Sequence, residues 1–511
     1  MESPPPLASK LFKHLFQRRS PACLRRHYGS MAKSASSIRD RGMKTNESRW
    51  QQRTNVLPED RSEEFLKYPY LTARDLRRRT ERPRRAKMLL RDFIEDSLYN
   101  PSYGYFSKQA VIFTPGEPFD FLNLRDELSF QAELGRRYTS FEDDLDAKAG
   151  RAVETRQLWH TPTELFADVY VEAIARYLVA NYRLTTYPYD DLVIFEMGAG
   201  RGTLMLNMLD FIRQVDPDVY ARTRFTVIEI SPSLAAIQAK RLTETAAASG
   251  HAERVEIVPV SIFDWDRYVP KPCFFLALEV MDNLAHDCIR YDVSSGEEEE
   301  EEEDEEQGRG QSRPSPQPLQ GHVLVDSLGD LYEFYARPLD PIASRFFSVR
   351  EAATGGFYPR PYHPNPLLRA VLNRLPFAAN LSRPEFIPTR LMQLFEVLDR
   401  YFPAHRLLAS DFDELPQAID GLNAPVVQTR YRRRMVPVTT PLVHQGYFDI
   451  LFPTDFSVAE ALYRAITGKL SRVSSHCDFM TRWADVDRTR TRSGESPLLS
   501  HYRNASVLLT V

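Results

Sequence analysis

The chain has 511 residues, of which 42% are hydrophobic and 27% charged, and this composition excludes a disordered, collagenous or disulfide-stapled protein. The formal net charge is -4; ten of the acidic residues form one run, so the rest of the chain is slightly basic without the strongly basic stretch typical of nucleic-acid binding. The four cysteines have no C-x-x-C spacing, and no apolar stretch approaches the ~20 residues of a membrane helix, so we expect a reducing compartment and no membrane span.

Residues 1–39 are typical of a mitochondrial transit peptide. From Ser3 onward they contain no acidic residue, and basic residues flank an apolar stripe at helical spacing, Leu7, Leu11 and Leu15. A disordered basic tail is the alternative. Residues 40–87 are polar, charged and aperiodic, which predicts a linker with a few helical turns.

Short apolar runs then alternate with helical or polar stretches. A helical segment is expected over 88–182, with its clearest helix at Thr163–Asn181, and residues 190–292 are expected to form the cofactor half of a core domain. The alternation indicates an α/β fold with a mostly parallel sheet that is covered on both faces. The expected strands are Leu192–Met197, Phe225–Ile230, Val255–Val260 and Phe274–Val280.

Residues 293–320 interrupt this pattern with the acidic run Glu297–Glu306. Ten adjacent like charges repel one another and cannot bury a core, which predicts a disordered, solvated insertion. It is either a tolerated surface loop or a docking segment for a basic partner.

The remaining chain is expected to hold a hairpin, a cap and the end of the core. His322–Asp326 and Leu331–Tyr335 flank a Gly-Asp turn and predict a hairpin. Residues 321–400 would comprise this hairpin and an inserted cap, and 401–511 the C-terminal part of the core. The last strands of the core are expected at Arg406–Ser410 and Tyr447–Leu451.

Three glycines follow the first core strand, at Gly198, Gly200 and Gly202, and a helical pattern begins at Leu204. Glycines at the carboxyl end of a first parallel strand let the chain turn sharply and let a nucleotide approach the main chain. The dinucleotide fingerprint needs its third glycine at position 203, where Thr203 stands. The G-x-G-x-G spacing instead favours S-adenosylmethionine.

Acidic residues follow the next two strands. Glu229 ends the second strand, where a carboxylate can accept both ribose hydroxyls, although a surface residue is the simpler reading of a lone strand-end acid. Asp264 follows the third strand, where an acid could meet the adenine amino group and Trp265 could stack on the ring.

Glu279 and Asp282 follow the fourth strand. Two carboxylates at this position could hold a cationic acceptor and assist its deprotonation, while a role in capping the next turn is equally compatible with the residue types. Tyr99, Tyr103 and Tyr105 could line an acceptor channel, or simply pack in the core.

Five blocks in consistent order resemble the MidA-type (DUF185) methyltransferases, a family that includes the mitochondrial arginine methyltransferase of complex I assembly. Weaker echoes at Ser410–Phe412 and Asp455–Phe456 extend the resemblance over roughly residues 88 to 460. The resemblance implies a class I methyltransferase fold with an N-terminal, acceptor-side helical extension and inserted cap segments. It also implies S-adenosylmethionine as cofactor, symmetric dimethylation of a protein arginine, and cofactor binding by Glu196, Gly198, Gly200, Gly202 and Glu229. Asp264 is added to the expected cofactor-binding residues from its place after the third strand. The blocks are Arg91–Phe106, Thr161–Phe166, Glu196–Leu204, Glu229–Leu234 and Glu279–Leu284.

The chain departs from that family at Ala199, where the family usually has Pro, and at Leu278 and Ala285, which replace Asn and Pro. Phe263 and Asp264 stand in place of a Trp-His pair. The chain thus looks like a diverged, fungal-type member.

The resulting hypothesis is a methyltransferase of the mitochondrial matrix with Glu279 and Asp282 as catalytic residues, no metal and no nucleic-acid partner. Its protein substrate would belong to respiratory complex I. The main alternative is a catalytically diverged assembly or scaffold factor, which the changes at Leu278 and Ala285 favour. A nicotinamide-dependent dehydrogenase is disfavoured by Gly202 and Thr203.

Overall fold

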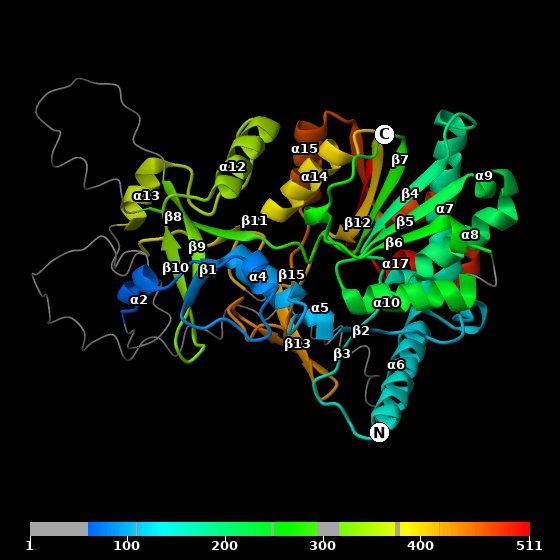
Figure 1. Ribbon diagram of the computed structural model, residues 1–511, viewed down its shortest axis with the longest axis horizontal. Helices are drawn as coiled ribbons and strands as arrows, with labels where there is room; N and C mark the ends of the chain where they lie inside the picture. The colour runs from blue at the N-terminus through cyan, green and yellow to red at the C-terminus, as the bar shows by residue number, and fades with distance from the viewer. Residues whose placement is uncertain (1–59, 109, 247–249, 294–315, 374–378, 418) are drawn as a thin grey trace, which may run out of the picture.

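The computed structural model describes residues 60–108, 110–246, 250–293, 316–373, 379–417 and 419–511. The expected transit peptide, the first part of the linker and most of the acidic insertion lie outside these ranges. Two sheets dominate the architecture, and in Figure 1 the smaller one lies to the left of the larger one. In the described part of the chain, no helix has both the length and the apolar character needed to cross a bilayer.

A seven-stranded sheet forms the larger core. Five neighbouring strands, β12 to β6 in the sheet order, are parallel, and the two C-terminal strands pair antiparallel at the β12 edge. The fold is therefore the α/β, mostly parallel class expected from the sequence. In sheet order the strands are β16 (Ser471–Ser475), β17 (Ala505–Thr510), β12 (His405–Phe412), β7 (Cys273–Leu278), β4 (Leu192–Met197), β5 (Thr223–Ile228) and β6 (Val255–Val258).

Alternate side chains of each central strand enter two different cores. On β7, Phe274 and Leu276 pack on one face, while Phe275 and Ala277 pack on the other. Burial on both faces is the reason these strands are continuous apolar runs in the sequence. The helices on the first face are α7 (Pro162–Thr185), α8 (Thr203–Val215), α9 (Pro217–Ala221), α16 (His476–Trp483) and α17 (Pro497–Ser500), and those on the second are α12 (Pro341–Thr354), α14 (Thr389–Tyr401) and α15 (Phe456–Thr467).

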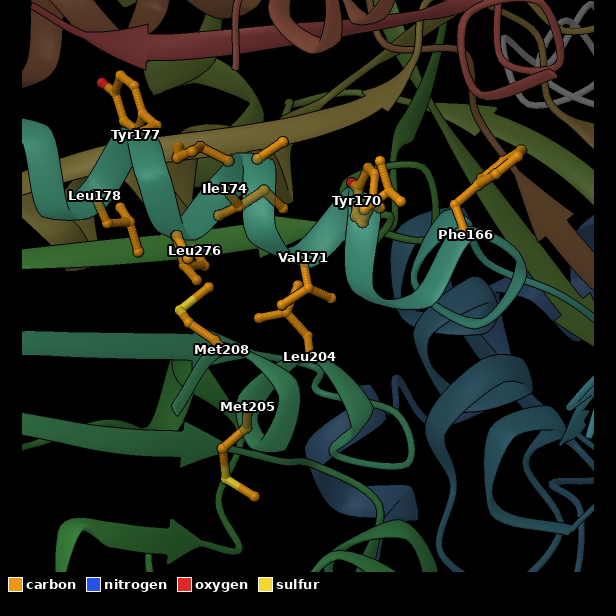
Figure 2. Close-up of a cluster of buried hydrophobic side chains, with 14 of the residues drawn as sticks. Phe166, Tyr170, Val171, Ile174, Tyr177, Leu178, Leu204, Met205, Met208 and Leu276 are labelled. Carbon is orange, nitrogen blue, oxygen red and sulfur yellow. The ribbon is translucent and has the colours of Figure 1, made fainter. Parts of the chain in front are cut away.

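Helix α7 covers most of the first face. Thr161 caps its N-terminus by accepting the backbone N–H of Glu164, and Pro162 occupies the first turn, where no N–H is needed. Figure 2 shows Val171 and Leu178 on the side of α7 toward Leu204 and Met208 of α8. This packing fixes the start of α8, and with it the end of the glycine turn.

The smaller sheet has five strands, and the expected hairpin is confirmed as β9 and β10. Its core is shared with α4 (Leu90–Tyr99), which packs on β1, β8 and β9 of this sheet and also contacts β15 (Asp449–Leu451). Phe65 stacks on Phe334 at 4.5 Å, so the described end of the expected linker is packed on this sheet. The strands are β1 (Ala86–Leu89), β9 (Gln317–Val325), β8 (Asp287–Asp292), β11 (Glu385–Ile387) and β10 (Leu331–Ala336), and the helices beside them are α2 (Ser62–Lys67), α3 (Ala73–Leu76) and α13 (Pro366–Asn373).

Two expectations about the C-terminal half are corrected. The run Tyr447–Leu451 contributes β15 (Asp449–Leu451) to a separate three-stranded sheet with β13 (Val426–Tyr431) and β14 (Arg434–Val438), and not a strand of the main sheet. The segment 340–400 does not form only a cap: α12 and α14 pack on α15 and bury the second face of the main sheet. Long-range packing, which local sequence patterns do not encode, decides both placements.

The three-stranded sheet docks on α6 (Glu127–Ala149) through buried charge. Arg430 pairs with Glu142, and Arg433 lies 2.7 Å from Asp146. Carboxylates of this chain thus pair with the basic tract around Arg430. A small parallel pair, β2 (Ala110–Ile112) with β3 (Gln157–Trp159), and the short helix α5 (Tyr105–Lys108) complete this side; α10 (Pro232–Arg241) follows β5.

Candidate functional site

A cavity of about 1150 Å³ lies at the carboxyl ends of β4, β5 and β7. Ligands of open α/β sheets bind at this edge, in the crevice outside the strand ends. Gly198, Gly200, Glu229, Glu279 and Asp282 all line this cavity, so the structure brings the expected cofactor and acceptor residues together.

The glycine turn forms one wall. Gly198, Gly200 and Gly202 have φ of +70°, +54° and +78°, in the left-handed region that favours glycine. A Cβ on Gly198 would lie 2.7 Å from Val280 Cγ1, and one on Gly200 would lie 3.0 Å from Ile112 Cδ1. Gly202 precedes α8 as its N-cap residue. The bare main chain of the first two glycines is therefore what faces the cavity.

Glu229 is tied to this turn by a residue that the sequence reasoning missed. Its Oε1 accepts from the backbone N–H of Ser231 at 2.9 Å, and its Oε2 accepts from Gln238 Nε2 at 3.0 Å. The same Gln238 nitrogen donates to the Gly200 carbonyl at 2.9 Å. Gln238 is fully buried on α10, three residues after buried Ala235; a polar residue on the buried face of a predicted helix is the signal that could have found it.

Burial raises the pKa of Glu229 to about 7. A carboxylate has about four lone-pair sites, so Glu229 keeps accepting capacity for hydroxyl groups beside its two present hydrogen bonds. Together with the cradle of Gly198 and Gly200, this donor and acceptor set fits the ribose and main-chain contacts of an adenosyl cofactor.

Glu196 lies behind the turn, at the end of β4. It is buried, and its Oε2 has no hydrogen-bond partner among the described residues. Burial, together with the charge of Glu229, raises the pKa of Glu196 to about 8. The side chain is therefore held mainly in its protonated form at neutral pH.

Asp264 lies apart from the expected adenine position. Its carboxylate pairs with Arg77 and is 37% exposed, while Trp265 packs into the core 5.3 Å from Phe402. The preceding residues Ile262 and Phe263 line the cavity instead. Apolar side chains therefore line the cavity where adenine is expected, whereas the Asp264 carboxylate forms an ion pair with Arg77.

On the acceptor side, the chain turns sharply after β7. Glu279 has φ +50°, an uncommon conformation for a residue with a Cβ, and its N–H donates to Ser410 O at 2.8 Å. Asp411 Oδ2 accepts from the backbone N–H groups of Met281 at 2.7 Å and Asp282 at 3.1 Å. Because Asp411 accepts the backbone N–H groups of this turn, the Glu279 side chain is not needed to cap them.

Four buried carboxyl groups gather here. Burial and the Asp411 charge raise the pKa values of Glu279 and Asp282 well above the ordinary range. Burial also raises the pKa of Asp411 to about 6 and that of Asp449 to about 7. Asp282 Oδ1 has no hydrogen-bond partner in the described part of the chain. Such a group of acids stabilises an entering cation and can hold a proton that the cation releases.

Of the three tyrosines considered for an acceptor channel, Tyr99 lines the cavity. Its ring stacks on Phe106 at 5.4 Å, and its hydroxyl donates to Asn283 O at 3.2 Å. Tyr103 instead donates to Asp96 at 2.7 Å, and Tyr105 packs edge-on against Phe106 in the core.

The far walls come from α6, β3 and β13, and include Gln131, Trp159, His160 and Gln428. Sequence reasoning missed these residues because none belongs to a motif. Across the described ranges, no group of three or more His, Cys, Asp or Glu side chains suits a metal ion.

Comparison with known proteins agrees with this geometry. The family model described as "Putative S-adenosyl-L-methionine-dependent methyltransferase" matches residues 173–474. The "Protein arginine methyltransferase NDUFAF7 homolog, mitochondrial" of Schizosaccharomyces pombe is 23% identical over 413 residues, which cover 79% of this chain and 80% of that protein.

Two solved structures align with most of the chain. A COG1565 superfamily member from Burkholderia thailandensis bound to S-adenosyl-homocysteine is 13% identical with a TM-score of 0.48, covering 83% of this chain and 88% of that one. A native structure of a COG1565 superfamily protein from the same organism is 13% identical with a TM-score of 0.47, covering 83% of this chain and 87% of that one.

Proposed function

The chain belongs to the Methyltransf_28 family of S-adenosyl-L-methionine-dependent methyltransferases, and from this membership we propose that it methylates an arginine side chain of a mitochondrial protein. The MidA-type resemblance of the sequence motifs is confirmed by the family match. The observation that supports the arginine assignment is the buried group Glu279, Asp282 and Asp449, which lines the cavity next to the glycine turn and can offer carboxyl groups to a cation, with Asp411 behind it.

Different residues of the cavity would bind different parts of the cofactor. The main chain of Gly198 and Gly200 would cradle the cofactor, Glu229 would accept its ribose hydroxyls, and Phe263 would contact the adenine. When bound, S-adenosylmethionine supplies an electrophilic methyl group. Glu196 and Asp264, which lie behind and beside this wall, would support it rather than contact the cofactor.

Glu279 and Asp282 would hold the acceptor. A guanidinium presents a planar fork of N–H donors that matches carboxylate oxygens, and two carboxylates fix the plane in which its nitrogen lies. Positioning of the nitrogen supplies much of the rate in a transfer of this kind. A carboxylate oxygen of Glu279, whose pKa is raised, then takes up the proton that the nitrogen releases.

The assignment of a mitochondrial arginine substrate rests on the fission-yeast relative and on the resemblance to the MidA-type family. A protein arginine methyltransferase is the printed function of the fission-yeast relative, and its printed location is mitochondrial. We extend both to this chain, with a complex I protein as substrate and symmetric dimethylation as product. The transit-like residues 1–39 support a matrix location.

A catalytically diverged assembly factor is the second candidate. Leu278 packs against the apolar core and Ala285 lines the cavity, so the acceptor side lacks the polar residue and the proline that are usual in the MidA-type family. Such a factor would keep the cofactor cradle and lose transfer.

Two measurements separate the candidates. Calorimetry with S-adenosylhomocysteine should show binding for the wild type and for Glu279→Gln; absence of binding to folded wild-type protein would contradict both candidates. Radiolabelled S-adenosylmethionine should label a mitochondrial extract with the wild type and not with Glu279→Gln. Binding without any labelling would favour the assembly factor.

A further inference from the structure

Three neutral side chains on the far walls of the cavity carry buried polar atoms with no hydrogen-bond partner among the described residues. They are Oε1 of Gln131 on α6, Nε1 of Trp159 at the end of β3, and Oε1 of Gln428 on β13. Most buried polar atoms of native proteins are hydrogen-bonded, so these three atoms on the far walls indicate a missing partner; the Tyr502 hydroxyl, elsewhere in the lining, also has none among the described residues. Of the three atoms on the far walls, two are acceptors and one is a donor.

These side chains are held in place by their surroundings. Gln131 Nε2 lies 2.9 Å from His501 Nδ1, which fixes the side chain, and the Trp159 ring packs edge-on against Phe106 at 6.2 Å. Gln428 lies on the central strand of its sheet, opposite Asp449 in the register. The terminal amide torsion of a glutamine is soft, so the Gln428 oxygen can turn toward an entering group without a change of backbone, whereas the contact with His501 sets the orientation of the Gln131 oxygen.

The cavity also has room and access for a chain segment. Its volume of about 1150 Å³ exceeds the roughly 300–1,000 Å³ typical of sites for one small molecule. Leu128, which lines it at the start of α6, is 70% exposed and marks an open mouth. A segment entering past α6 would share one cavity with the three neutral side chains and with the carboxyl groups at Glu279.

On the basis of the proposed function, we infer that the part of the cavity lined by Gln131, Trp159 and Gln428 binds the main chain of the acceptor as an extended peptide. Glu279 and Asp282 bind the cationic side chain of the same peptide. The peptide unit is the group that presents N–H donors and C=O acceptors side by side, as two amide oxygens and one indole N–H require. The acidic groups in the cavity complement a cationic peptide. Because main-chain contacts do not read side chains, the enzyme tolerates varied residues beside the acceptor arginine.

The test compares two peptides as methyl acceptors of the full-length protein. The first is acetyl-Ala-Ala-Arg-Ala-Ala-amide, and the second carries N-methyl groups on the two backbone nitrogens that follow the arginine. We expect N-methylation to lower kcat/KM at least tenfold for the wild type and less than threefold for Gln428→Met and Gln131→Met, which keep side-chain length without the amide oxygen. Gln214→Met, the same change at an exposed position of α8, should keep the full tenfold difference.

Equal kcat/KM for the two peptides, or an undiminished difference in both cavity variants, would overturn the inference and leave buried water as the partner of these atoms. Labelling of mitochondrial protein but of neither peptide would also count against it. No labelling of any acceptor would instead overturn the proposed function itself. Since removing an unpaired buried oxygen leaves no partner behind, Gln428→Met should melt no lower than wild type; a clear loss of Tm would indicate a structural role.

Discussion

The Oδ2 atom of Asp411, on β12, lies 2.7 Å from the backbone nitrogen of Met281, in the turn that follows β7. This contact joins two parallel strands at the edge where the cavity lies and aims Glu279 and Asp282 into it. Burial and the negative charge of Asp411 together raise the pKa of Glu279. One buried carboxylate therefore contributes to both the position and the proton affinity of the proposed proton acceptor.

Replacement of Asp411 by Asn should shift the pH dependence of methyl transfer. Loss of the charge lowers the pKa of Glu279, so the acidic limb of the kcat profile should move to lower pH, while loss of one acceptor site in the turn should lower kcat about tenfold or more. A profile measured between pH 5 and 9 checks this. An Asn variant with reduced kcat and an unmoved limb would assign Asp411 a structural role only.

Gln238→Leu should weaken cofactor binding. The change leaves the Gly200 carbonyl and one oxygen of Glu229 without their shared donor, and a hydrogen bond to a charged group contributes about 1.5–3 kcal/mol. We expect the Kd for S-adenosylhomocysteine, measured by calorimetry, to rise roughly tenfold to a hundredfold. Gln214→Leu on exposed α8 is the matched control, and equal Kd values for the two variants would show that the bridge is unimportant.

Gly200→Ala should abolish tight cofactor binding. An alanine at position 200 would keep φ +54°, a backbone conformation that costs a residue with a Cβ roughly 1–2 kcal/mol, and its Cβ would lie 3.0 Å from Ile112 Cδ1, which must move away from the turn. Gly468→Ala has a similar φ of +66° with open space around it, and is the matched control for backbone strain. Both variants should lose stability, and only the first should lose binding.

Stability should fall as the pH rises from 7.5 to 9. The folded-state pKa of Glu196, about 8, lies above its unfolded value, so the folded state binds more protons in this window, and raising the pH removes that advantage. Buried histidines such as His476, with a pKa lowered to about 4 from the ordinary 6.5, are almost entirely neutral in both states above pH 7.5, so their opposite effect on stability is confined to lower pH. Chemical denaturation should show a loss on the order of 1 kcal/mol from this one group.

Glu196→Gln tests that assignment, because an amide does not titrate. Its unfolding free energy should fall less over the same window than that of the wild type. A variant with the same slope as the wild type would place the proton uptake elsewhere, for instance at Glu229 or Asp449, whose raised pKa values are both about 7.

The local patterns of the sequence were enough to predict the central strands, the glycine turn and the β9–β10 hairpin. Each depends on residues close together in the chain, such as Gly198, Gly200 and Gly202, so short-range periodicity encodes it. The residue types at Glu279 and Asp282 were also visible, but not what surrounds them.

Contacts between distant segments were not predictable. Asp411 reaches Met281 across 130 positions, and Gln157 bonds the Arg430 backbone across 273. The pairing of β17 with β12, and the placement of β15 outside the main sheet, likewise depend on packing that a single strand's pattern does not contain. Asp264 shows the same limit, since its position after a strand did not reveal its ion pair with Arg77.

The most direct test of the account is to find where the transferred methyl group arrives. Mitochondrial protein is incubated with S-adenosylmethionine carrying a deuterated methyl group, and the products are sequenced by mass spectrometry. We predict deuterated methyl on arginine nitrogens with wild-type protein, and none with a Glu279→Gln variant that still binds S-adenosylhomocysteine. Deuterated methyl on another residue type, or equal arginine labelling by the variant, would contradict the role assigned to the buried carboxyl groups.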